Sequence, residues 1–152
     1  MLRALALLLA LSLTACDGFG PSDALPDLGD GSTDPALLLG DTGWVAIAAV
    51  SDGEAVEFPA TGFTAQFTAD GIVGGRTSAN QYGGDYEASG DGAFDARDLI
   101  TTLVGESPRA EQLSAVLLRE LAEAATFEIQ GETLQVRSAD GDGIRFERSG
   151  AE

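Results

Sequence analysis

Asp-Gly dipeptides recur along this chain and restrict its folding options more than any other feature. From Trp44 onward they lie at positions 52–53, 70–71, 91–92, 140–141 and 142–143. Asp-Gly between apolar or alternating runs is the strongest short signal for a β-hairpin, because both central residues of a type I′ turn need positive φ. The runs between these dipeptides fit strands, over residues 44–50, 63–68, 72–77, 85–88, 126–130, 133–138 and 144–148. The sequence therefore predicts a sheet of antiparallel hairpins.

One amphipathic helix interrupts the strands. Ser107 and Pro108 have the residue types of an N-cap and a first helical position. An apolar stripe follows at helical spacing, made of Leu113, Val116, Leu117, Leu121 and Ala124. We expect the helix to end near Ala125 and two or three further strands to follow. The predicted fold class is mainly β (α+β): a curved antiparallel, barrel-like sheet packed on a single helix.

Several large side chains are predicted to form the core of this domain, namely Trp44, Phe67, Leu117 and Phe127. Glu111 falls in the first helical turn, where a carboxylate stabilises the helix dipole. We interpret Glu111 as a structural residue of this kind and not as a catalytic one.

The first sixteen residues predict where the protein is located. Arg3 precedes an apolar run over residues 4–13, too short to span a bilayer as a helix and typical of a secretory signal. The run closes on Leu13, Thr14, Ala15 and Cys16. These four residues resemble a bacterial lipobox, which implies that 1–15 is a signal peptide and that Cys16 is diacylated. Two or more acyl chains make a stable membrane anchor.

The next segment, 16–42, is predicted to be a flexible acidic tether. Residues 17–42 contain three of the five prolines and six aspartates, with few large apolar side chains. Such a composition buries too little surface to offset the entropy of ordering. A short turn at residues 37–39 that docks on the domain is the alternative. The folded domain itself is expected over 43–150.

Charge and missing residue types exclude several functions. The formal net charge is −17, with no histidine, and all eight basic residues are arginine. A charge of this sign repels nucleic acid. It is typical either of solubility close to a membrane or of halophilic adaptation. Without histidine or lysine, and with Cys16 blocked, base-activated nucleophiles are not available.

The same composition bears on metals and cofactors. The run 140–144 begins like a calcium loop, but Ile144 stands at a ligand position and no glutamate closes the loop. Zinc and other transition metals have no imidazole or thiolate to bind. We therefore expect no cofactor, no metal site and no catalytic residue.

The segment 80–86, Asn-Gln-Tyr-Gly-Gly-Asp-Tyr, carries a family likeness together with the preceding Phe-Thr-Ala-Asp-Gly-Ile-Val-Gly-Gly of 67–75. This arrangement resembles the META domain, the family that includes the heat-shock protein HslJ. The motif residues are Asn80, Tyr82, Gly84 and Tyr86, and we read them mainly as structural, with a ligand-facing aromatic patch as the alternative. Asn80 is expected to hydrogen-bond its own backbone two residues on. The tyrosines, four apart, should point to one face.

The chain lacks one feature that is common in this family, and the family has known biological associations. Members commonly carry Gly-Cys-Asn before the tyrosines and a second cysteine before the helix. Here those places hold Ser78-Ala79-Asn80 and the region of Gly105 and Glu106, so the disulfide is absent. The family is associated with the bacterial envelope, heat shock and antibiotic tolerance.

Together these observations predict a lipid-anchored envelope protein that is not an enzyme. We expect it to act in envelope integrity or in stress and antibiotic tolerance through contacts with envelope proteins. The alternative is a binder of small amphiphilic ligands in a barrel-like cavity. It should lie on the periplasmic side, on the inner or the outer membrane; Asp17 after Cys16 resembles the inner-membrane retention signal of enteric bacteria.

Overall fold

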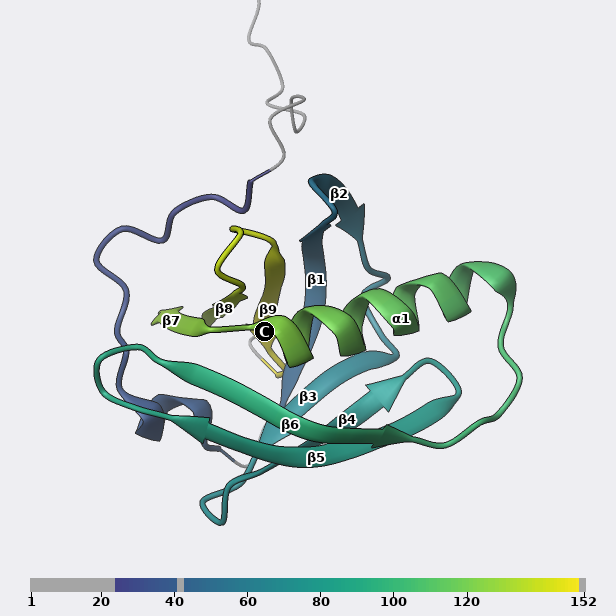
Figure 1. Cartoon of the computed structure of the whole chain (residues 1–152), viewed down its shortest axis with the longest axis horizontal. Coiled ribbons are helices and arrows are strands. Elements are labelled where there is room, and N and C mark those ends of the chain that lie inside the picture. The colour runs from purple at the N-terminus through teal and green to yellow at the C-terminus, as the bar shows by residue number, and fades with distance from the viewer. Residues whose placement is uncertain (1–23, 41–42, 151–152) are drawn as a thin grey trace, which may run out of the picture.

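A computed structural model describes residues 24–40 and 43–150 of the chain (Figure 1). A short 3₁₀ helix, η1 (Pro35–Leu38), precedes the sheet, and α1 (Pro108–Glu123) is the α-helix. The strands are β1 (Trp44–Ser51), β2 (Glu54–Glu57), β3 (Phe63–Phe67), β4 (Ile72–Thr77), β5 (Asn80–Ala88), β6 (Phe94–Thr101), β7 (Thr126–Gln130), β8 (Thr133–Arg137) and β9 (Gly143–Arg148).

All strand pairings are antiparallel and join the strands into one curled sheet. The strand order is β6-β5-β4-β3-β1-β9-β8-β7, with β2 paired to β1. The two ends of this path approach each other where the Phe94 amide donates to the Ala125 carbonyl at 2.9 Å. Helix α1 lies across the opening that remains (Figure 1). The predicted fold class, a barrel-like antiparallel sheet packed on one helix, is confirmed.

The core fills the space between the sheet and α1. Trp44, Leu117 and Phe146 are fully buried, and Phe67 and Phe127 are nearly so. The predicted core residues are therefore confirmed. The Trp44 indole N–H donates to the Leu38 carbonyl at 3.1 Å, so its polar atom also has a partner.

The Asp-Gly dipeptides do lie at turns, but the predicted type I′ geometry applies at one of them. Asp52 and Gly53 both have positive φ, 54° and 73°, in the two-residue connection of β1 and β2. At Gly71, Gly92 and Gly141 the glycine alone has positive φ. The aspartate at those turns keeps an ordinary backbone conformation, so they are not type I′ turns.

The sequence analysis did not predict two of the strands, β2 and β6. β2 reads Glu-Ala-Val-Glu, too short and too polar for an alternation to stand out. β6 begins Phe-Asp-Ala-Arg-Asp, and its charged residues masked the buried Phe94 and Ala96 between them. β5 also begins five residues earlier than predicted, at Asn80. The helix start is as predicted: Ser107 Oγ accepts from the Ala110 amide at 3.3 Å and Pro108 follows.

The described part of the predicted tether is not a free chain. Residues 24–40, which we call the strap, run across the domain, and Leu25, Leu28 and Leu38 are buried. The Gln135 and Arg137 side chains donate to the Pro26 carbonyl, each at 2.8 Å. The prediction of a flexible segment is wrong for these residues, because three leucines and several backbone hydrogen bonds suffice to dock it.

Candidate functional site

The four motif residues lie on β5, and both tyrosines point into the core. The Tyr82 hydroxyl donates to the Thr64 carbonyl at 2.8 Å, and the Tyr86 hydroxyl donates to the Thr68 carbonyl at 2.9 Å. Burial raises the pKa of Tyr82 well above its ordinary value. Tyr86 packs edge-on against Phe67, with ring centroids 5.0 Å apart. These contacts tie β5 to β3 and its following turn, and they place neither ring on a ligand-facing surface.

Gly84 lies at a bulge between β5 and β6. The strand register shifts between Gly83 and Asp85, and Asp98 on the opposite strand has a φ of 53°. A Cβ atom on Gly84 would lie 2.5 Å from the Arg97 carbonyl oxygen. Only glycine fits there, because the bulge brings the β6 backbone too close for a side chain.

Asn80 holds the loop that follows β6. Its Oδ1 accepts from the Val104 amide at 2.6 Å and from Thr102 Oγ1 at 2.9 Å, and its Nδ2 donates to the Val104 carbonyl at 2.9 Å. These partners of the Asn80 side chain are more than twenty residues away in the sequence, and are not the local backbone that the sequence analysis expected. The buried asparagine therefore fixes residues 102–104 in one conformation.

Glu106 provides a second attachment for the same loop. Its carboxylate accepts from the Ala79 amide at 3.0 Å and from Ser114 Oγ at 2.7 Å. Burial raises the pKa of Glu106, but the hydrogen bonds from Ser114 and Ala79 outweigh it and leave the pKa below its ordinary value. A carboxylate thus joins the two regions where the META resemblance implied a lost disulfide.

An apolar surface lies on and beside the loop that these two residues hold. The exposed fractions are 76% for Ile100, 94% for Leu103, 56% for Val104 and 44% for Ile72. We call these four residues the docking surface. Ile72 and Ile100 line one hollow, Leu103 and Val104 line another, and the two hollows adjoin at Thr101 and Thr102, which line both. Single exposed hydrophobic residues are normal, whereas a contiguous apolar patch marks an interaction site.

A hollow of about 550 Å³ lies within the docking surface and is lined by Ile72, Gly83, Asp85, Asp98 and Ile100, among others. Gly83 pairs with Gly74 on β4 and with Ile100 on β6. Because Tyr82 points inward, the neighbouring Gly83 position faces outward. Gly83 therefore contributes backbone without a side chain to the floor of the hollow, its strand partner Gly74 adds no side chain beside it, and Ile72 and Ile100 also line the hollow.

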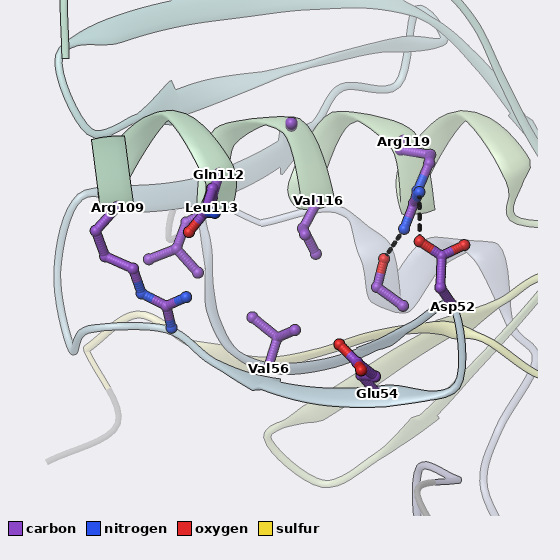
Figure 2. A pocket seen from close by; sticks show the side chains of 10 residues that line it. Asp52, Glu54, Val56, Arg109, Gln112, Leu113, Val116 and Arg119 are labelled. Atoms are coloured by element: carbon purple, nitrogen blue, oxygen red, sulfur yellow. Dashed lines mark hydrogen bonds and ion pairs between the residues drawn. The ribbon is translucent and has the colours of Figure 1, made fainter. Parts of the chain in front are cut away.

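A second depression lies between α1 and the β1–β2 hairpin (Figure 2). It measures about 380 Å³. Val56, Leu113 and Val116 provide the apolar part of the lining, and Arg109 extends from the start of the helix toward the side of the cleft that β2 forms. At the other end Arg119 pairs with Asp52 at 2.9 Å. We call this depression the helix cleft.

Glu120 is buried beside the helix cleft, with only 1% of its surface exposed. Its Oε1 accepts from Ser51 Oγ at 2.5 Å and from Arg119 Nε at 3.2 Å. Among the described residues its Oε2 has no hydrogen-bond partner. Burial raises the pKa of Glu120 above the ordinary glutamate value, although the contacts with Ser51 and Arg119 act in the opposite direction.

The expectations about metal binding, membrane-spanning segments and lipidation concern residues of which the structure describes only a part. Residues 24–40 and 43–150 contain no group of three acidic, cysteine or histidine side chains placed to hold a metal ion. Within the same residues no helix combines the length and apolarity needed to cross a membrane. The lipobox residues Leu13, Thr14, Ala15 and Cys16 lie outside the described part of the chain, so lipidation remains a prediction.

Comparison with known proteins identifies the family. The model of the META domain matches residues 37–151. This chain belongs to the META domain family. The match begins six residues before the domain start predicted at residue 43, and it includes the second half of η1, Leu37 and Leu38. Among curated proteins none matches the chain.

Solved structures agree with this META fold. A protein from Burkholderia xenovorans, solved by NMR, is 26% identical and aligns over 84% of this chain and 96% of its own, with a TM-score of 0.63. A second NMR structure is 17% identical over 72% of this chain and 90% of its own, with a TM-score of 0.53. At that identity the second likeness shows the fold alone.

The sequence analysis named the motif residues but missed the docking surface. The signal was the uncharged run of residues 99–105, Leu-Ile-Thr-Thr-Leu-Val-Gly. Such a run has strong β propensity, so from sequence alone it resembles the buried end of a strand that precedes the helix. Only the fold shows that Leu103 and Val104 leave the sheet and face outward.

Proposed function

We propose that this META-domain protein is a lipid-anchored protein of the cell envelope and acts through contacts with other envelope proteins. Cys16 carries the acyl chains, and no step of catalysis is involved. Envelope integrity or tolerance of stress and antibiotics is the setting that the family likeness implies. The domain would thus serve as an anchored binding module on the periplasmic side of a membrane.

The observation that carries this proposal is the docking surface. A loop with two exposed apolar side chains would normally collapse onto the domain, since burial of a leucine or valine is worth about 1.5–3 kcal/mol. Asn80 and Glu106 instead hold residues 102–106 outward by five hydrogen bonds to partners beyond the loop. An apolar surface held in place in this way favours a protein contact.

Anchoring is tested with Cys16→Ser in the producing bacterium. We expect the wild-type protein to remain with the membrane fraction and its N-terminal peptide to begin at the acylated Cys16. The Cys16→Ser variant should leave the membrane fraction and appear among the soluble proteins of the periplasm. A variant that stays with the membrane as fully as the wild type would contradict the anchor.

Protein contact is tested by chemical crosslinking in intact envelopes, with Ile100→Asp compared to Leu37→Asp. Leu37 is 40% exposed on η1, outside the docking surface, and therefore makes a matched control. We expect crosslinked species that disappear in Ile100→Asp and persist in Leu37→Asp. Equal crosslinking in all three proteins would count against the docking surface.

A second candidate is the binding of small amphiphilic molecules, and the helix cleft favours it. Its lining combines apolar side chains, such as Leu113 and Val116, with polar and charged ones, and Arg109 has no ion pair among the described residues. The predicted location in a barrel cavity is not where this space lies, because α1 and the core side chains occupy the barrel mouth. Thermal melts with amphiphilic carboxylates should show a concentration-dependent rise in Tm, lost in Arg109→Ala, if this candidate holds.

A further inference from the structure

We propose that the docking surface binds an extended segment of a partner protein that carries an apolar residue next to a lysine or arginine. The apolar side chain lies over Gly74 and Gly83, between Ile72 and Ile100. The basic side chain lies against Asp85 and Asp98. This inference rests on the proposed function and adds the chemistry of the partner.

The floor of the hollow supports the apolar half of this recognition. Gly74 and Gly83 are directly paired, so no side chain fills the outer face of the sheet at that point. A Cβ atom on Gly83 would find only the Val73 carbonyl oxygen, at 3.7 Å. Because the local packing would accept a side chain at Gly83, the open floor is a vacancy of about one side chain, which a partner's side chain can fill.

The charges at one end of the hollow support the basic half. Asp85 and Asp98 both line it and are exposed. Arg97, the strand partner of Asp85, forms its ion pairs with Glu87 at 2.7 Å and Asp95 at 3.2 Å. The whole chain carries a net charge of −17, which adds a long-range attraction for a cationic partner.

The point at which the strap begins favours a protein over the anchoring bilayer. Seven residues lie between Cys16 and residue 24, which makes eight steps along the chain and a span of at most about 26–29 Å. The described chain begins at the top of Figure 1, whereas β4, β5 and β6 form the bottom. An anchor at Cys16 is therefore attached to the end of the domain opposite the docking surface.

The test uses the purified soluble chain that starts at Asp17 and three nine-residue peptides with blocked ends. The first reads Gly-Ser-Lys-Phe-Lys-Val-Lys-Ser-Gly. The second replaces each lysine by glutamate, and the third replaces phenylalanine and valine by alanine. Dissociation constants come from fluorescence anisotropy, and ¹⁵N NMR locates the binding site.

We expect the first peptide to bind at least about tenfold more tightly than either control, since one seated apolar side chain is worth about 1.5–3 kcal/mol and 1.4 kcal/mol is tenfold. NMR shifts should cluster at residues 72–74, 82–85 and 98–104. Gly83→Leu places a side chain on the floor of the hollow, where the partner's apolar residue would lie, and should weaken binding about tenfold or more. Leu37→Asp should bind like the wild type.

Four results would overturn the inference. Equal binding of all peptides, or NMR shifts in the helix cleft, would remove the proposed recognition. Binding to phosphatidylcholine–phosphatidylglycerol vesicles that Ile100→Asp abolishes would assign the surface to a bilayer. A dimer in sedimentation that Ile100→Asp dissociates would assign it to a second copy. If the peptides fail to bind but Ile100→Asp still abolishes the crosslinks in envelopes, only the proposed partner chemistry is wrong and the protein-contact function stands. If Ile100→Asp leaves the crosslinks unchanged, the protein-contact function itself is wrong.

Discussion

The outer face of the sheet is covered at one end and open at the other. On β8, Gln135 points away from the core yet is buried, because the strap lies over it. On β5, Gly83 points outward and nothing in the described chain covers it, so Ile72 and Ile100 stay exposed. One end of this outer face is thus covered by the N-terminal strap of the chain itself, and the other end is open for contact with another molecule.

The difference between the two ends has a physical basis. The strap places Leu25 and Leu28 on the domain and satisfies its backbone through Gln135 and Arg137. At the open end, Asn80 and Glu106 satisfy the backbone of the loop but turn its apolar side chains outward. Hydrogen bonds hold both segments, and only the direction of the side chains differs.

The largest expected effect concerns the residue that joins the strap to the core. Trp44 is fully buried, and its indole N–H donates to the Leu38 carbonyl. The Arg148 guanidinium lies over the indole, 4.3 Å from the ring centroid. Trp44→Ala should lower the free energy of unfolding by about 3–5 kcal/mol because it leaves a large cavity. Urea denaturation measures the change. Coincident curves for the two proteins would contradict the burial of Trp44.

The covered end is tested by Leu25→Ala. We expect a loss of about 2 kcal/mol, near the low end for a buried leucine, since the strap can shift into part of the space. Urea denaturation again provides the measurement, and amide exchange should accelerate in residues 24–30. If Leu25→Ala is neutral, the strap contributes nothing to stability and the comparison fails.

The tyrosine contacts give a smaller effect. Tyr82→Phe removes the hydrogen bond to the Thr64 carbonyl and leaves that buried acceptor without its partner. The expected loss is about 1–2 kcal/mol. Tyr82→Phe should also bind the basic peptide as the wild type does, because the ring faces inward. Weakened peptide binding would show that the motif tyrosine has a direct role at the surface.

Glu120→Gln should change how stability depends on pH. The pKa of Glu120 is raised in the folded state, so this group favours folding most at low pH. That contribution is lost as the pH rises from the unfolded value of about 4.3 through the higher folded value. Glutamine does not titrate, and therefore the Tm of the variant relative to the wild type should increase from pH 4 to pH 7. A constant difference across that range would contradict the raised pKa.

The smallest expected effect on stability belongs to the open end. Ile100→Asp should change the free energy of unfolding by no more than about 0.5 kcal/mol, since the side chain is exposed. Urea denaturation of Ile100→Asp and Leu37→Asp should therefore give similar curves. A loss of several kcal/mol in Ile100→Asp would mean that the side chain packs within the domain.

The sequence predicted the parts of the fold that follow from local patterns. The runs between the Asp-Gly dipeptides predicted β1, β3 and β4 to within one residue, and the Ser107-Pro108 pair placed the start of α1 correctly. The strap was missed because its stability depends on tertiary partners, such as Gln135 for the Pro26 carbonyl, that no local pattern reveals. Asn80 was recognised, but its role depends on a loop more than twenty residues away. The docking surface was missed because burial of residues 99–104 is decided by where β6 ends.

Hydrogen–deuterium exchange of the full-length protein tests the account most directly, in native envelope preparations and again after purification in detergent. Peptides that span residues 98–104 should exchange more slowly in the envelope than in the purified protein, because a partner covers the docking surface there. Peptides from the strap, residues 24–40, should exchange alike in both preparations, because the chain itself covers that end. Equal exchange of residues 98–104 in the two preparations would contradict the claim that this open face is a binding surface.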